Sequence, residues 1–209
     1  MTSSEPARVI VGDLPVPDDD FISPSSYQTA RLCEFHEVGA DGRPARHRTV
    51  QTIRALRDGV TTHRYSFDLS QARVDSIRGG TPGDPYRVKG SLWAVELTLP
   101  KPLRRFEEHT LEYVTTFRGD GPVEPYFRRA AHRRVENAAI KVTFHPEMLP
   151  ARVWWAQWAD YREPHDHLIE RAEVAVDPAH SVSHQVAVLE RAVAGFVWEF
   201  EAWQPSTTR

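Results

Sequence analysis

The stretch that decides the fold is QTARLCEFHEV at residues 28–38, followed by Ala40-Asp41-Gly42-Arg43 and then RHRTVQTIRALR at residues 46–57. Two strand-like runs flank a short turn. The Asp-Gly pair in that turn supplies the positive φ angle of a tight reversal. This stretch predicts an antiparallel β-hairpin.

The same pattern continues on the C-terminal side of the hairpin. Asp58-Gly59 predicts a second turn into a strand at 61–68, in which Tyr65 and Phe67 share a face, so a three-strand meander is expected. Further strands are predicted where apolar residues alternate with polar ones, at 93–99, 111–117, 138–144, 153–159, 170–176, 183–189 and 193–203. A short helix is the alternative for 182–194. About ten strands with frequent turns predict an all-β fold, an antiparallel two-sheet β-sandwich.

Length and composition set the expected domain organisation. The chain has 209 residues, of which 40% are hydrophobic and 26% charged, so it can bury a core without metal or disulfides. We expect an acidic tail rich in Pro, Ser and Asp at 1–26, one β-sandwich domain at 27–203 and a disordered C-terminus at 204–209. Cys33 has no internal partner, and neither a signal peptide nor a membrane span is apparent. A cytoplasmic protein without membrane contact is expected.

Basic residues gather in the hairpin. Residues 43–64 carry six arginines against Asp58 alone. A solvated sheet face explains this pattern better than phosphate binding does, because the net charge of the chain is −3. If this face has a function, the candidate binding residues are Arg46, Arg48, Arg54 and Arg57.

Trp154, Trp155 and Trp158 form the densest aromatic cluster in the sequence. Neighbouring side chains on a strand point to opposite faces, so one of Trp154 and Trp155 is expected at a surface or groove. These three tryptophans are therefore candidate binding residues, although covering a sheet edge is the favoured explanation for them. If both prove buried, a third layer or a partner is expected on that sheet.

The best candidate for a metal site is Glu163-Pro164-His165-Asp166-His167. On an extended segment His165 and His167 point to the same side and could share one Zn²⁺ ion. A third ligand could come from His180, His184 or Glu170. Histidines with this spacing are more often solvated polar residues, so the favoured expectation is that the chain has no cofactor.

Motifs of other enzyme classes are missing from the sequence. Ser76 and Ser91 lie in no Gly-x-Ser-x-Gly elbow, and the Gly-rich run at 78–83 lacks the Gly-Lys-Ser/Thr ending of a phosphate loop. A dinucleotide fingerprint and a helix-turn-helix pattern are also missing.

The run from His47 to Val60, followed by Tyr65-Ser66-Phe67, resembles a β-rich accessory region of uncharacterised actinobacterial proteins, and so do Leu149 to Trp154 and the aromatic last strand. Some of those proteins carry the region after a helix-turn-helix domain, which this sequence lacks. The resemblance implies no catalytic residues. It implies an accessory or ligand-sensing domain of a regulatory system.

These observations favour a non-catalytic binding module that recognises a protein partner or a small ligand. One alternative is a metal-dependent enzyme centred on His165 and His167. The other is nucleic-acid binding by the arginine-rich face, which the charge balance does not favour.

Overall fold

The computed structural model describes residues 7–10, 26–67, 72–89, 92–117, 123–131, 133–158 and 168–201. Fifteen strands form three sheets in these ranges, with no helix among them. The predicted all-β class is confirmed. The single two-sheet sandwich of about ten strands is wrong, because two separate small sheets share one large sheet.

The seven-stranded sheet, here called the large sheet, has the order β1 (Ala7–Ile10), β14 (Ser181–Glu190), β11 (Val135–Phe144), β2 (Tyr27–Val38), β3 (Pro44–Ala55), β9 (Glu108–Phe117) and β5 (Ala72–Arg78). Two of its pairings, β1 with β14 and β11 with β2, are parallel, and the others are antiparallel. β1 falls within the predicted tail, so part of that segment pairs as an edge strand.

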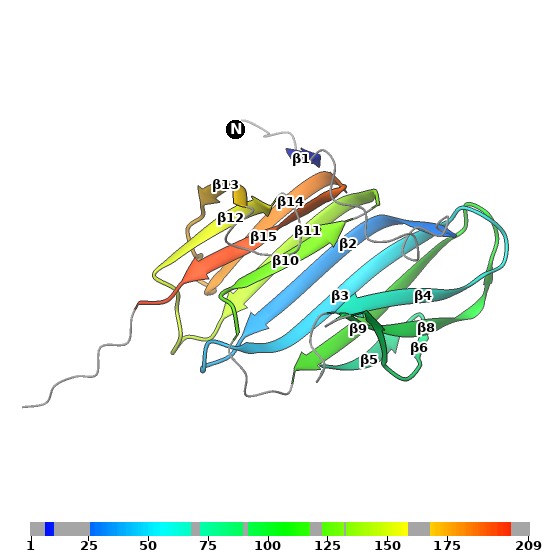
Figure 1. Cartoon of the computed structure of the whole chain (residues 1–209), viewed down its shortest axis with the longest axis horizontal. Coiled ribbons are helices and arrows are strands. Elements are labelled where there is room, and N and C mark those ends of the chain that lie inside the picture. The colour runs from blue at the N-terminus through cyan, green and yellow to red at the C-terminus, as the bar shows by residue number, and fades with distance from the viewer. Residues whose placement is uncertain are drawn as a thin grey trace, which may run out of the picture.

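Two four-stranded sheets lie over opposite ends of the large sheet (Figure 1). The β15 sheet has the order β10 (Tyr126–Ala131), β15 (Ala192–Glu199), β12 (Arg152–Trp158) and β13 (Leu168–Glu173). The β8 sheet has the order β4 (Val60–Phe67), β8 (Leu92–Leu103) and β6 (Thr81–Pro82), and β7 (Tyr86–Lys89) also pairs with β8.

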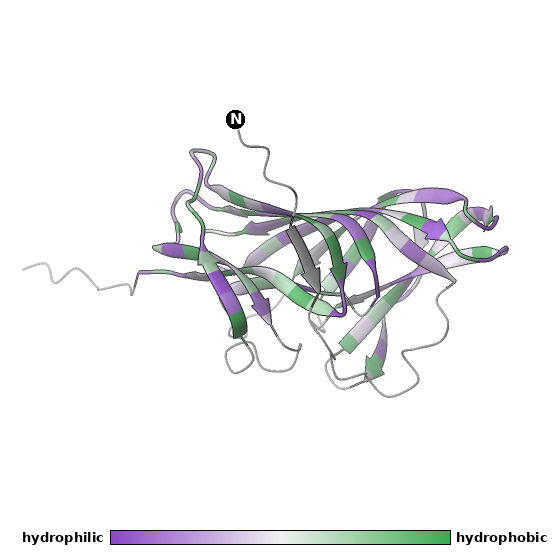
Figure 2. Cartoon of the chain, turned by 90° about the horizontal axis from the view of Figure 1, so that it is seen from above, coloured by the Kyte–Doolittle hydropathy of each residue, from purple (hydrophilic) through white to green (hydrophobic). Residues whose placement is uncertain are grey.

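The predicted hairpin is the centre of the large sheet. Its strands β2 and β3 pair antiparallel from Tyr27 opposite Ala55 to Val38 opposite Pro44, and Gly42 in the turn has a φ of +75°. Along both strands buried positions alternate with partly buried ones. Hydrophilic and hydrophobic residues are interspersed along the strands of the molecule (Figure 2). The inner face therefore meets the small sheets, and the outer face carries the arginines.

Each small sheet closes its own apolar core. The first core joins Leu32 and Ile140 of the large sheet to Phe196 and Trp198 of the β15 sheet. The second core joins residues of β3, β5 and β9 to residues of the β8 sheet: Ile53, Val74, Leu111 and Tyr113 face Val60, Phe67, Val95, Leu97 and Leu103. The molecule therefore has two lobes, here called the β15 lobe and the β8 lobe, held side by side by one continuous sheet.

Two local predictions are corrected by this arrangement. After the turn at Gly59, whose φ is +80°, β4 pairs with β8 rather than with β3, so the three-strand meander is wrong. The chain crosses between layers there because Val60 and Phe67 pack onto the large sheet instead of extending it. The helix alternative for 182–194 is also wrong, because Val182, His184 and Val186 pair with β11 at a period of two.

The described residues include no helix long and apolar enough to cross a membrane.

Substituting Gly195 tests the close approach of β15 and β10. A Cβ atom there would collide with the carbonyl oxygen of Phe127 and lie 2.7 Å from Cα of Arg128. We expect Gly195→Ala to lower the free energy of unfolding by ~2 kcal/mol, because the paired strand must shift. The matched control is Gly83→Ala, whose Cβ would meet only the Glu96 carbonyl at 3.5 Å. Equal stability of the two variants in urea titrations would contradict this packing.

Candidate functional site

A row of buried polar side chains crosses the inner face of the large sheet, between the two apolar cores. We call it the polar seam. Its members are Glu34 and His36 on β2, His47, Thr49 and Gln51 on β3, His63 and Tyr65 on β4, Tyr113 and Thr115 on β9, and Arg129 on β10.

Strand register brings these residues together. Glu34 lies opposite Thr49, and His36 lies opposite His47. On the other side of β3, Thr49 is paired with Tyr113. Polar positions that are well separated in the sequence therefore form one continuous patch under the boundary of the lobes.

The charged centre of the seam is an ion pair between the large sheet and the β15 sheet. Nη1 of Arg129 donates to Oε1 of Glu34 at 3.2 Å, and Nε2 of His47 lies 3.6 Å from the same oxygen. The side chain of Glu34 is 1% exposed and that of Arg129 is 23% exposed. Solvent therefore reaches part of the Arg129 side chain but not the Glu34 carboxylate.

Hydrogen bonds between side chains extend the seam into the β8 lobe. Gln51 donates to the hydroxyl of Thr29 at 2.7 Å and accepts from the hydroxyl of Tyr113 at 3.3 Å. Thr115 donates to the hydroxyl of Tyr65 at 3.2 Å, which ties β9 to β4. This part of the seam is well satisfied and links the large sheet to the β8 sheet.

The histidines are packed against rings. His36 stacks on Phe127, with centroids 4.6 Å apart, and lies 5.8 Å from the ring of His47. His63 lies 5.3 Å from the ring of Tyr27 and 6.2 Å from that of Tyr113. These contacts fix the imidazole planes but use no ring nitrogen.

Several buried polar atoms of the seam have no hydrogen-bond partner. They are Oε2 of Glu34, both ring nitrogens of His36 and of His63, Nδ1 of His47 and Nε of Arg129. An unpaired buried donor or acceptor costs about 1–3 kcal/mol, and native proteins supply partners for nearly all of them. The concentration of such atoms at one place marks the seam as the candidate site.

The environment of the seam shifts the ionisation of its members. Burial lowers the pKa of His36 well below its ordinary value, and the neighbouring charge on His47 adds to this. Burial, followed by the charge of Arg129, lowers the pKa of His63 to about 3. Burial alone would raise the pKa of Glu34, but Arg129 and then His47 outweigh it, so this pKa lies below its usual value. At neutral pH the two imidazoles are uncharged and Glu34 is ionised.

Thr49, His47 and Glu34 superficially resemble a nucleophile, base and orienting acid. Both contacts, however, use the same atom: Nε2 of His47 lies 3.1 Å from Oγ1 of Thr49 and 3.6 Å from Oε1 of Glu34. A catalytic triad needs the acid on one ring nitrogen and the nucleophile on the other. This arrangement therefore has no proton path of that kind.

The expectation that Trp154 or Trp155 lies at a surface is wrong. Their exposed fractions are 3% and 6%, and Trp158 is 1% exposed. Trp155 belongs to the first core and stacks on His184, whereas Trp154 points to the other face. The guanidinium groups of Arg152 and Arg171 each lie 4.7 Å from the Trp154 ring. Charged side chains of the same sheet thus contribute to covering that tryptophan.

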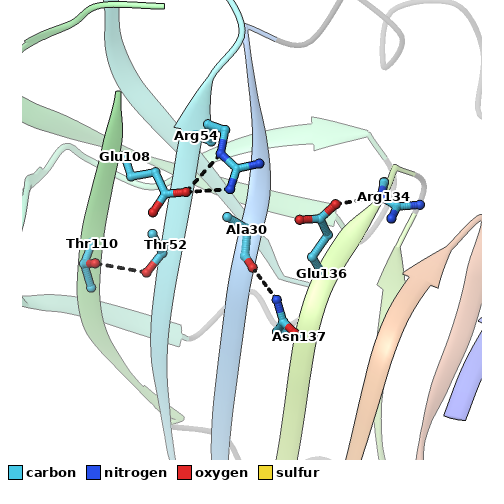
Figure 3. A network of polar contacts seen from close by, with 8 residues as sticks. All are labelled: Ala30, Thr52, Arg54, Glu108, Thr110, Arg134, Glu136 and Asn137. Carbon is cyan, nitrogen blue, oxygen red and sulfur yellow. Dashed lines mark hydrogen bonds and ion pairs between the residues drawn. The ribbon is translucent and has the colours of Figure 1, made fainter. Parts of the chain in front are cut away.

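The arginines of the hairpin lie on the outer face of the large sheet. Arg54 pairs with Glu108 at 2.7 Å, beside a hydrogen bond between Thr52 and Thr110 (Figure 3). Arg46 pairs with Glu37 at 3.3 Å, Arg48 pairs with Glu112 at 2.6 Å, and Arg57 is exposed next to the turn at Gly59. The solvated sheet face expected from the sequence therefore has its positive charge matched by carboxylates on β2 and β9.

The predicted metal ligands His165 and His167 lie outside the described residues. Among the described residues no group of three or more His, Cys, Asp or Glu side chains could hold a metal ion. Two of the suggested third ligands are described: His184 stacks on Trp155, and Glu170 is on the edge strand β13.

Sequence reasoning missed the seam. The sequence does contain one indication of it, because several inward positions of the hairpin are polar where alternation predicts apolar side chains. These positions are Glu34, His36, His47, Thr49 and Gln51. Arg129 and His63 come from other sheets, so only the tertiary structure brings them there.

Comparisons with known proteins bear on the fold alone. No family model matches the chain, and no curated protein matches it. A crystal structure described as that of a "putative protease" from Parabacteroides distasonis is similar over 84% of this chain, with a TM-score of 0.51 and 9% identity. The chain spans 41% of that protein's length.

The lowered pKa values predict loss of stability in mild acid. The unfolded chain binds protons on His36 and His63 below pH ~6.5, whereas the folded chain resists them. The free energy of unfolding should therefore be highest above that pH. It should fall by ~1.4 kcal/mol per pH unit for each histidine as the pH drops toward 4.5. The contribution of Glu34 is lost only below about pH 4.5.

Urea titrations between pH 7.5 and 4.5 measure this effect. His63→Phe should lower the slope of the free energy of unfolding against pH by the contribution of one histidine. A stability that is flat over this range in the unsubstituted chain would contradict the buried neutral state of the histidines.

Proposed function

We propose that this chain is a non-catalytic binding module that takes up a small polar ligand in the polar seam. The single observation that carries the proposal is the group of unpaired buried polar atoms on Glu34, His36, His47, His63 and Arg129. These atoms come from β2, β3, β4 and β10, so they belong to all three sheets. A ligand placed among them would bridge both lobes.

The available donors and acceptors suggest the class of ligand. Nε of Arg129 is a permanent, charged donor, and each neutral imidazole offers one donor and one acceptor. Oε2 of Glu34 is an acceptor with no partner. A small molecule with an acidic group for Arg129 and a hydroxyl or amide group for Glu34 and the histidines would satisfy this set.

The partial exposure of Arg129 suggests where a ligand would enter the polar seam. Its side chain is 23% exposed and that of Glu34 is 1% exposed, so an incoming ligand would meet Arg129 before Glu34. Charge-assisted bonds to a guanidinium are among the stronger polar contacts and are directional. The ligand would therefore be oriented with its acidic group toward β10.

Neither alternative has comparable support in the described residues. Nucleic-acid binding needs excess positive charge, but Arg46, Arg48 and Arg54 are each paired with a carboxylate on the outer face. The metal-dependent alternative rests on His165 and His167 outside those residues. The accessory role implied by the resemblance is compatible with a ligand-binding module and remains part of this proposal.

The proposal is tested by ligand-dependent stability. Thermal melts of the whole chain are recorded with acetate, succinate, benzoate and inorganic phosphate, and small molecules released from natively purified protein are identified by mass spectrometry. A bound acid at about 100 times its Kd should stabilise the fold by ~2.7 kcal/mol.

Matched variants separate the seam from the outer face. Arg129→Lys keeps a positive charge but loses the planar donor, and it should abolish the stabilisation. Arg54→Ala removes an exposed arginine of the outer face and should retain it. The proposal is wrong if no acid stabilises or co-purifies with the chain, which would indicate that water alone satisfies the seam.

A further inference from the structure

The connection between β8 and β9 displays an aromatic side chain at the far tip of the β8 lobe. Phe106 is 62% exposed, the largest fraction among the exposed large hydrophobic residues of the described ranges. Its φ angle is +68°, in the left-handed region that residues other than Gly, Asn and Asp rarely adopt. Because the Phe106 ring is exposed, its burial does not offset the energetic cost of this backbone conformation.

The unusual backbone conformation is held in place by a dense set of hydrogen bonds. The N–H of Phe106 donates to the carbonyl of Ala55 at 2.8 Å, and the N–H of Ala55 donates to the carbonyl of Glu107 at 2.9 Å. The N–H of Arg105 donates to Oδ1 of Asp58 at 2.8 Å, and that of Arg104 donates to Oε2 of Glu107 at 2.9 Å. The backbone of the turn is therefore preorganised, so a partner meets Phe106 at a fixed place on the surface.

Basic side chains surround the ring. The guanidinium of Arg105 lies 4.6 Å from the Phe106 centroid, and Arg104 is exposed beside it. Arg57 is exposed on the neighbouring connection, and Lys101 pairs with Glu107 at 2.7 Å. We call the group Leu56, Arg57, Lys101, Arg104, Arg105 and Phe106 the basic tip. A hollow of about 650 Å³ opens at the tip and is lined by residues 101, 102 and 104–107.

We propose that the basic tip docks a short acidic segment of a partner protein, with one apolar side chain of that segment seated against Phe106 in the hollow. Backbone strain at an exposed position persists where surrounding structure holds it, and such positions gather at binding sites. Leu56, which is 39% exposed, extends the apolar contact, and the arginines receive the carboxylates.

The composition of the tip favours a peptide over other acidic partners. Single-stranded nucleic acid binds along several aromatic platforms with a basic track between them, and this tip has one ring. An anionic membrane would need more apolar surface than Phe106 and Leu56 supply, since one short anchor binds only marginally. The tip has one ring and four cations, of which Lys101 alone forms an ion pair with a described residue. This composition matches one apolar residue flanked by acids.

A peptide-display selection tests the proposal. The whole chain is immobilised and panned against random dodecapeptides, and the enriched peptides are resynthesised for binding measurements. We expect sequences rich in Asp and Glu around one large apolar residue, with affinity that falls at least tenfold when the salt concentration is raised from low to physiological levels.

The decisive variant is Phe106→Gly, because glycine tolerates the positive φ and the fold should be as stable as before or more so. This variant should reduce peptide binding at least tenfold, and Phe106→Tyr should restore it. Ile77→Gly removes a side chain that is 54% exposed on β5, away from the tip, and should leave binding unchanged.

Three results would overturn the proposal. The first is a selection that enriches no acidic sequence, and the second is enrichment that Phe106→Gly does not affect. The third is Phe106-dependent binding to oligo-dT or to phosphatidylserine vesicles in place of the peptides. None of these results bears on the polar seam, so the two proposals fail or stand separately.

Discussion

Glu34 and Arg129 meet between the large sheet and the β15 sheet, at the boundary between the two apolar cores. A carboxylate that is 1% exposed must keep a cationic partner, because an unpaired buried charge costs several kcal/mol. The pair therefore constrains where β10 sits over β2, and with it the whole β15 sheet. His47 lies beside the same carboxylate, and His36 stacks on Phe127 of β10.

The two lobes differ in how they meet the seam. On the side of the β8 lobe, Gln51, Tyr113, Thr115 and Tyr65 satisfy one another through hydrogen bonds. On the side of the β15 lobe, His36 lies among rings with both nitrogens unpaired. Polar networks that are fully satisfied make a fold rigid, whereas partly satisfied ones leave interactions for another molecule to complete. His63 on β4 also keeps both ring nitrogens unpaired, so we place the ligand where the unpaired atoms of the two lobes face the seam.

Local chemistry made the hairpin predictable from sequence, because Asp41-Gly42 sets the turn and alternation sets the faces of β2 and β3. The outer face was also foreseeable, since its arginines occupy the exposed positions. The three-sheet arrangement was not predictable from the sequence, because the turn at Gly59 does not indicate whether β4 pairs with β3 or crosses to another layer. Trp154 was misplaced because its cover includes Arg171 on β13, a contact that periodicity along β12 cannot reveal.

The central claim is that the Glu34–Arg129 pair couples the large sheet to the β15 sheet. A double-mutant cycle with Glu34→Gln, Arg129→Met and the double variant, followed by urea unfolding at pH 7.5, measures it most directly. The account predicts that each single variant loses ~3 kcal/mol or more and that the double variant is much less destabilised than the sum, with a coupling energy of at least ~2 kcal/mol. Additive losses would contradict it.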